Sequence, residues 1–184
     1  MVTFIIILGL CNLFINRYFK RIESNFGVIR RNLKLVSKVY DHMNKILTLL
    51  NADRVAINKI SIEDGVILKR MIHEVSRTKK PLINELKTLP IEHKEYVKLK
   101  RMDELGSYGT YVDEVLVRHE KGVLLNEGIK YVTNIKIIDK ISTAYILTIY
   151  YKDYDIKTVK YKKSVAMLYV RLINRIFKNN IEVL

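Results

Sequence analysis

The order of strand-like and helix-like segments is the feature of this sequence that most restricts its fold. Residues 53–60 and 66–75 form one strand-like pair, and residues 130–138 and 142–151 form a second pair rich in Ile, Thr and Tyr. Such patterns are typical of β-strands. Segments with helical spacing precede, separate and follow the two pairs. This order predicts an α+β domain in which helices flank one antiparallel sheet.

Turn-forming residues define the ends of several segments. Asp64 and Gly65 predict a tight hairpin turn within residues 61–65, because this dipeptide tolerates positive φ angles. Thr88 and Pro90 predict the first turn of a helix that runs to Gly106.

Two further segments lie between that helix and the second strand pair. Residues 107–111 are expected to form a loop or a short strand. Residues 113–126 predict a helix that ends before Gly128.

Long amphipathic helices are predicted at both ends of the domain, from Val28 to Asn51 and from Ile156 to Lys178. In each helix, apolar residues recur every three or four positions and define one apolar face. The predicted face of the first helix consists of Val36, Val39, Tyr40, Met43, Ile46, Leu47 and Leu50. The predicted face of the second consists of Tyr161, Val165, Leu168, Tyr169, Leu172 and Ile176.

An apolar segment precedes the domain. No charged residue occurs between Val2 and Ile15, and the first is Arg17. A single-pass membrane anchor is the favoured interpretation, although the segment is shorter than the roughly 20 residues of a typical spanning helix. A cleaved signal peptide and a buried core or interface helix are the alternatives. The predicted organisation is an apolar helix at 1–21, a joint at 22–27, the domain at 28–178 and a tail at 179–184.

Basic residues follow this segment closely. The chain has 33 Lys+Arg and 19 Asp+Glu, a net charge of +14. If residues 2–19 contact membrane lipid, these charges predict that the domain faces the cytoplasm. The residues predicted to contact the anionic membrane surface are Arg17, Lys20, Arg21, Arg30 and Arg31.

Candidate residues for chemistry are few. Cys11 is the only cysteine, and the four histidines show no metal-ligand spacing, so neither a metal nor a cofactor is predicted. Glu92, Glu95, Asp103 and Glu104 lie among lysines and are expected to form a solvated, salt-bridged helix face.

Three phrases of the sequence resemble those of GAF domains, a family of small sensor domains related to PAS domains. Residues 47–55 read LTLLNADRV, residues 124–130 read LLNEGIK and residues 145–149 read YILTI. The first is similar to the helix end that precedes the first strand of many GAF domains. The resemblance covers about residues 28–178 and implies a sensing or scaffolding fold.

This resemblance also implies a ligand pocket and a dimer. GAF pockets lie between the sheet and the crossover segments, which here implies a pocket lined by Ser107, Tyr108, Thr110, Tyr111, Glu114 and His119. A homodimer is expected to form through the two terminal helices, with Val36, Val39, Tyr40 and Met43 beside Tyr161, Leu168, Tyr169 and Leu172.

The predicted function is a membrane-anchored, non-enzymatic domain that senses a small ligand or docks a protein partner. The alternative is a basic virion or nucleic-acid-associated protein that uses its +14 charge to neutralise phosphates. An enzyme of unfamiliar type is a third, disfavoured interpretation. The Ile-, Lys- and Asn-rich composition suits an accessory protein of a bacterium or bacteriophage.

Overall fold

An antiparallel sheet forms the middle layer of the fold. The computed structural model describes residues 27–78, 81–82, 86–103, 105–115, 117–140, 142–153 and 156–180. Its six strands lie in the order β3-β2-β1-β6-β5-β4, and every neighbouring pair is antiparallel. The strands are β1 (Arg54–Glu63), β2 (Val66–Ser76), β3 (Thr88–Pro90), β4 (Ser107–Tyr111), β5 (Tyr131–Asp139) and β6 (Thr143–Tyr151). The prediction of an α+β domain built on an antiparallel sheet is confirmed.

A tight turn joins β1 to β2. Asp64 and Gly65 adopt φ angles of 50° and 78°, as the two central residues of a type I′ turn require. The predicted hairpin is therefore confirmed. The turn fixes the register in which Glu63 is paired with Val66.

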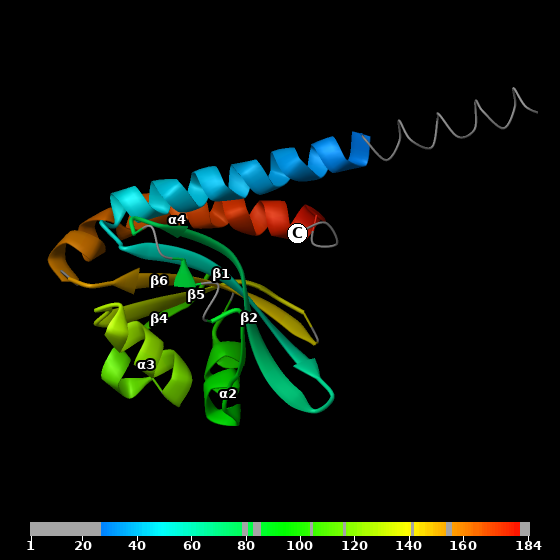
Figure 1. The fold of residues 1–184 in the computed structure, drawn as a ribbon. Helices are drawn as coiled ribbons and strands as arrows, with labels where there is room; N and C mark the ends of the chain where they lie inside the picture. Colours follow the sequence, from blue (N-terminus) through cyan, green and yellow to red (C-terminus); the bar gives the residue numbers. More distant parts are fainter. Residues whose placement is uncertain are drawn as a thin grey trace, which may run out of the picture.

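Helices cover both faces of the sheet (Figure 1). The N-terminal helix, described over residues 27–49, lies beside α4 (Ile156–Asn180) on one face. The shorter helices α2 (His93–Arg101) and α3 (Arg118–Asn126) lie on the other face. The sheet thus separates a layer of two long helices from a layer of two short ones.

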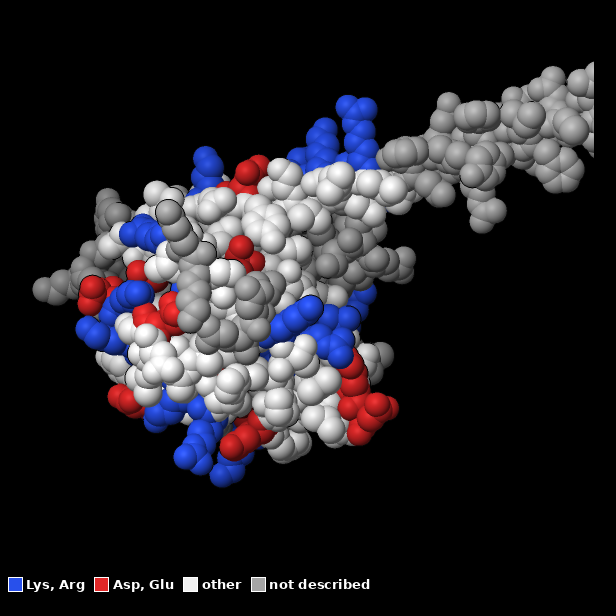
Figure 2. All heavy atoms as spheres, in the orientation of Figure 1, with Lys and Arg blue, Asp and Glu red and all other residues white. Residues whose placement is uncertain are grey.

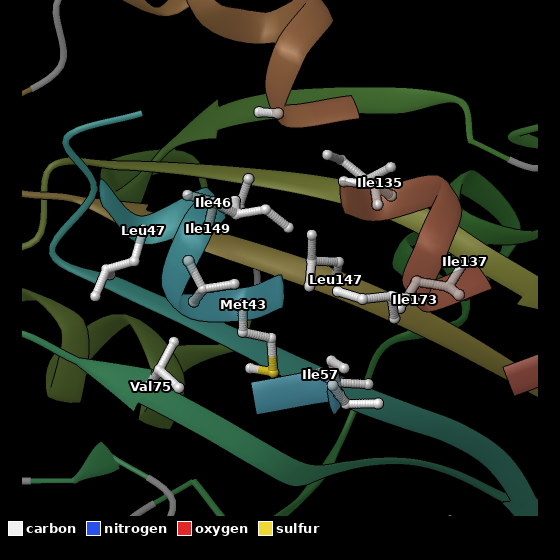
Figure 3. Packing of buried hydrophobic residues seen from close by; sticks show 14 of the residues in the cluster. Met43, Ile46, Leu47, Ile57, Val75, Ile135, Ile137, Leu147, Ile149 and Ile173 are labelled. Carbon is white, nitrogen blue, oxygen red and sulfur yellow. The ribbon is translucent and has the colours of Figure 1, made fainter. Parts of the chain in front are cut away.

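The long-helix layer and the sheet share one hydrophobic core. Figure 3 shows Met43 and Ile46 of the N-terminal helix and Ile173 of α4 close to strand residues such as Ile57 and Leu147. All five of these side chains are at most 1% exposed.

The predicted apolar face of α4 is wrong in part, although Tyr169 and Ile176 of that face do pack against the core. Val165 and Leu168 are 49% and 53% exposed, whereas the buried positions of α4 are Ala166, Val170, Ile173 and Phe177. The buried face is rotated by one residue from the predicted one. Both faces are apolar, and the face that carries Ala166 allows a closer approach of the helix to the sheet.

A β-bulge ties α4 to β5. The register between β5 and β6 shifts between Lys136 and Ile138. A bulge leaves backbone groups without ladder partners. The buried Asn174 side chain of α4 donates a hydrogen bond to the Ile137 carbonyl and satisfies one of them.

The segment at Thr88–Pro90 forms the edge strand β3, so the predicted helix start at these residues is wrong. Leu89 is 5% exposed and packs in the core on the short-helix side. Pro90 lies opposite Leu68 and has no N–H group, which an edge strand tolerates. Burial of Leu89 explains why the chain is extended here. The following helix, α2, ends at Arg101 rather than near Gly106.

The crossover between β4 and β5 also differs from the prediction. Residues 107–111 form strand β4, and Val112–Glu114 form a single 3₁₀ turn. The α-helix then begins only at Arg118.

The predicted apolar helix at 1–21 lies outside the described residues. Among the helices that the structure describes, none combines the length and the hydropathy needed to cross a bilayer.

Candidate functional site

A cavity of about 230 Å³ lies on the short-helix side of the sheet. Strands β2, β4 and β5, helices α2 and α3 and the 3₁₀ turn contribute to its walls. Its lining residues are Lys69, Lys94, Glu95, Lys98, Tyr108, Thr110, Glu114, Val115, Glu120, Val132 and Asn134.

Half of the predicted pocket residues line this cavity. Tyr108 and Thr110 come from β4, and Glu114 comes from the 3₁₀ turn. Because side chains alternate along a strand, residues 108 and 110 point to the same face of the sheet. The Thr110 hydroxyl also donates a hydrogen bond to Glu114 Oε2 at 3.0 Å.

The other three predicted residues do not line the cavity. The Ser107 hydroxyl accepts a hydrogen bond from Lys163 Nζ of α4 at 3.1 Å, on the long-helix side. Tyr111 is 52% exposed, and its ring meets the Tyr131 ring edge-on at a centroid distance of 5.0 Å. His119 lies on the exposed side of α3. A ligand-binding role for any of the six residues stays a prediction.

A buried ion pair forms one wall of the cavity. Lys69 Nζ of β2 lies 2.6 Å from both carboxylate oxygens of Glu120 of α3. These residues are only 8% and 3% exposed. Burial lowers the pKa of Lys69, but the carboxylates of Glu120 and Glu95 together outweigh this effect, so the pKa is raised. Lys69 and Glu120 therefore form a salt bridge inside the protein.

Glu95 of α2 is a half-buried residue beside this pair. Its Oε2 atom is shielded from solvent and has no hydrogen-bond partner in the described part of the chain. Burial raises the pKa of Glu95, and Glu120 raises it further while Lys69 opposes them. The expectation that Glu95 belongs to a solvated helix face is therefore wrong. Leu99, four residues later, is buried, so Glu95 lies on the inward face of α2.

Polar side chains from three adjacent strands continue from the cavity across the sheet. The Asn58 amide donates a hydrogen bond to the Thr148 hydroxyl at 2.8 Å, and Thr148 donates to Asn134 Oδ1 at 2.9 Å. The Asn134 oxygen is therefore occupied as an acceptor. This arrangement orients the Asn134 amide at the cavity wall.

Tyr108 and Lys98 lie together at the cavity. Lys98 Nζ lies 4.3 Å from the centroid of the Tyr108 ring, in a cation–π contact. Burial raises the pKa of the Tyr108 hydroxyl, and the Glu95 carboxylate adds to this effect. Tyr108 therefore stays a neutral hydroxyl at physiological pH.

A second hollow lies on the long-helix side. Its volume is about 650 Å³, and its lining residues are Asp41, Asn44, Lys45, Thr48, Leu49 and Tyr169. Most of these residues are exposed, so this hollow is a surface groove.

The cavity brings together residues that the sequence analysis did not identify. Lys69, Glu120 and Asn134 lie on three elements far apart in the chain. For Glu95, another lining residue, the sequence does hold a signal. Its four-residue spacing from Leu99 places the carboxyl group on an apolar helix face.

The comparisons with known proteins concern the fold. No protein-family model matches the chain, and no curated protein matches it by sequence. Among solved structures, the GAF domain of a two-component sensor histidine kinase from Bacillus halodurans is similar, with a TM-score of 0.52 and 16% identity, over 80% of this chain and 95% of that one.

Two further solved structures are also similar. A GAF domain from Synechocystis in its photoproduct state gives a TM-score of 0.51 and 14% identity, over 77% of this chain and 94% of that one. A far-red absorbing dark state with bound biliverdin gives a TM-score of 0.53 and 10% identity, over 80% of this chain and 97% of that one. The sheet order, the two helix layers and these similarities show that the chain has the fold of GAF domains.

Proposed function

We propose that this protein is a non-enzymatic sensor domain that binds a small molecule in the cavity beneath α2. The observation that carries the proposal is the Oε2 atom of Glu95, which is shielded from solvent and has no hydrogen-bond partner in the described residues. Ligand sites are concave and combine apolar walls with a few polar groups that orient the ligand. Val115 and Val132 supply apolar wall here, and Tyr108 and Asn134 supply polar groups.

The cavity volume favours a small ligand. Pockets for drug-sized molecules usually have volumes of about 300–1,000 Å³. The cavity of about 230 Å³ lies below that range. We therefore propose a ligand much smaller than the biliverdin that is bound in one of the similar structures.

Native mass spectrometry of the full chain, released from detergent micelles without added ligand, tests this proposal. Val132→Trp places a bulky ring in the cavity and should remove any retained small-molecule mass. Val165→Trp adds the same ring at a half-exposed position of α4 and should leave that mass in place. If both variants retain the mass equally, the ligand binds elsewhere. If neither the wild-type chain nor a variant retains a small-molecule mass, the result counts against a bound ligand.

We further propose that residues 2–19 anchor the protein to a membrane, with the domain in the cytoplasm. Support comes from the uncharged run before Arg17 and from the exposed Arg30 and Arg31 of the N-terminal helix. Figure 2 shows basic side chains projecting close to where the described chain begins. Such charges are attracted to anionic lipid.

Membrane fractionation tests the anchor. The full chain should stay in the membrane pellet after alkaline carbonate extraction. A chain lacking residues 2–19 should move to the supernatant. Full-length protein in the soluble fraction without detergent would contradict the proposal.

We also propose a homodimer formed by the long-helix layer. Val39 and Met43, two residues of the expected interface, are fully buried against the sheet. Among the side chains of this layer that the structure describes, the large apolar ones that remain exposed are Val28, Ile29, Leu33, Val165 and Leu168. Exposed apolar side chains on two neighbouring helices suit contact with a second copy.

A further inference from the structure

The charges around the cavity are separated by depth. Lys69 and Glu120 neutralise each other through two contacts of 2.6 Å, so neither group is free to bind a charged ligand. Glu95 is then the acidic group left inside the cavity, and its Oε2 atom lacks a hydrogen-bond donor in the described structure. A buried acceptor of this kind favours a ligand that brings a donor.

The mouth of the cavity carries two cations. Lys94 and Lys98 lie four residues apart on α2, and residues at this spacing share one helix face. Both are exposed, and the described structure shows no ion pair for either. Two ammonium groups on adjacent helical turns can hold a carboxylate between them.

A zwitterion matches this arrangement. An ammonium group satisfies the shielded Glu95 oxygen, and a carboxylate on the same carbon meets the two lysines, which lie one and three residues from Glu95 on α2. Glu114 is also near the mouth, but its Oε2 atom already accepts a hydrogen bond from Thr110. The size of the cavity and the apolar side chains of Val115 and Val132 suit a compact, uncharged side chain.

We propose that the cavity binds a free α-amino acid with an uncharged side chain, whose ammonium group contacts Glu95 and whose carboxylate contacts Lys94 and Lys98. This inference rests on the proposed small-ligand function and names the class of ligand. Ammonium binding favours the ionised form of Glu95, so the amino acid should bind more tightly as pH rises through the range in which Glu95 ionises.

Isothermal titration of the full chain in detergent tests the inference with defined probes. The probes are L-valine, L-leucine, L-methionine and L-glutamine, together with isocaproate and isoamylamine, which are leucine without its ammonium group and without its carboxylate. At least one amino acid should bind. If leucine is that ligand, isocaproate and isoamylamine should each bind about tenfold or more weakly than leucine, the loss expected for one charged contact. If another amino acid binds, its own deaminated and decarboxylated analogues are used in their place.

Two sets of variants test which residues contact each charged group of the ligand. Glu95→Gln should weaken the amino acid and leave the deaminated analogue unchanged. The double variant Lys94→Ala/Lys98→Ala should weaken the amino acid and leave the decarboxylated analogue unchanged. The matched control is Lys34→Ala/Lys38→Ala, because these exposed lysines have the same spacing on the helix layer across the sheet.

The outcomes separate this inference from the proposed function. Three results would overturn the inference. None of the four amino acids binds, or an analogue that lacks one charged group binds as tightly as the amino acid, or folded Glu95→Gln binds the amino acid with unchanged affinity. A different small molecule retained in native mass spectrometry and displaced by Val132→Trp would leave the proposed function standing. Circular dichroism confirms that each variant is folded.

Discussion

Arg54 is a fully buried charged side chain that connects several parts of the fold. Its guanidinium lies 2.8 Å from Glu74 of β2 and 2.7 Å from Glu127, the residue that follows α3. It also donates to the Thr78 hydroxyl at 2.5 Å. The planar guanidinium presents five N–H donors in a rigid fork, whereas the lysine ammonium is a compact charge on a flexible stem. At the residue scale, the fold depends strongly on this one side chain.

Substitution of Arg54 should therefore be costly. Arg54→Met leaves Glu74 and Glu127 without their buried cation, and breaking a buried pair in this way typically costs about 3–5 kcal/mol of unfolding free energy. Arg77→Met removes an exposed arginine that donates to Asn51 Oδ1, and should cost about 0.5 kcal/mol or less. Urea denaturation followed by circular dichroism measures both. Equal losses in the two variants would disprove the structural role given to Arg54.

His73 makes stability depend on pH. Burial lowers the pKa of His73, and its ring meets the Tyr40 ring edge-on at 5.3 Å. The unfolded chain binds the proton at a pH where the folded chain does not. The contribution of His73 to stability is therefore constant above the usual histidine value of about 6.5, and it falls as pH decreases from there to the lowered pKa.

His73→Phe tests this effect because phenylalanine keeps an aromatic ring but binds no proton. Denaturation of both proteins at several pH values between about 8 and 5 should show a shallower loss of stability in the variant. The two proteins should differ least in this slope above about pH 7. An identical slope over the acid range would show that His73 does not contribute.

At the scale of elements, sequence signals succeeded where the cause is local. The Asp64-Gly65 turn was predictable because the φ angles depend on these two residues. Strand β3 was not, because Leu89 is extended only through its burial in the core. The face of α4 was missed because two apolar faces compete in its sequence. The pairing of Lys69 with Glu120 joins residues 51 positions apart, and no local pattern records it.

The bulge in β5 leads to a prediction about α4. Asn174→Leu should destabilise the protein by about 1–3 kcal/mol, because the buried Ile137 carbonyl loses its donor. Asn179→Leu changes the same residue type at an exposed position of α4 and should have little effect. Thermal denaturation compares the two variants. A similar melting temperature for both would mean that the Asn174 contact adds no stability.

At the scale of the whole molecule, the two helix layers have different roles in this account. The short-helix layer holds the cavity, and the long-helix layer carries exposed apolar side chains beside the basic N-terminal region. The sheet lies between them, so the proposed ligand site and the proposed dimer interface are on opposite faces of one sheet. The sequence indicated both layers through helical periodicity, but their cavity depends on contacts among distant elements.

The proposed dimer is tested at this scale. Leu33→Glu/Leu168→Glu places charges on the exposed apolar surface of the long-helix layer and should convert a dimer into a monomer. Leu125→Glu is the control, since Leu125 is 48% exposed on α3 across the sheet. Light scattering coupled to size-exclusion chromatography gives the masses. A monomeric wild-type protein, or a dimer that survives the double substitution, would contradict the proposed interface.

Methyl NMR tests the central claim most directly, namely that the cavity beneath α2 binds a small molecule. The full chain in detergent is labelled at its valine methyl groups and titrated with the amino acids and with a low-molecular-mass cell extract. The signals of Val115 and Val132 should shift, while those of Val39 and Val170 in the long-helix core should not. Shifts confined to the long-helix core, or no shift with any addition, would contradict it.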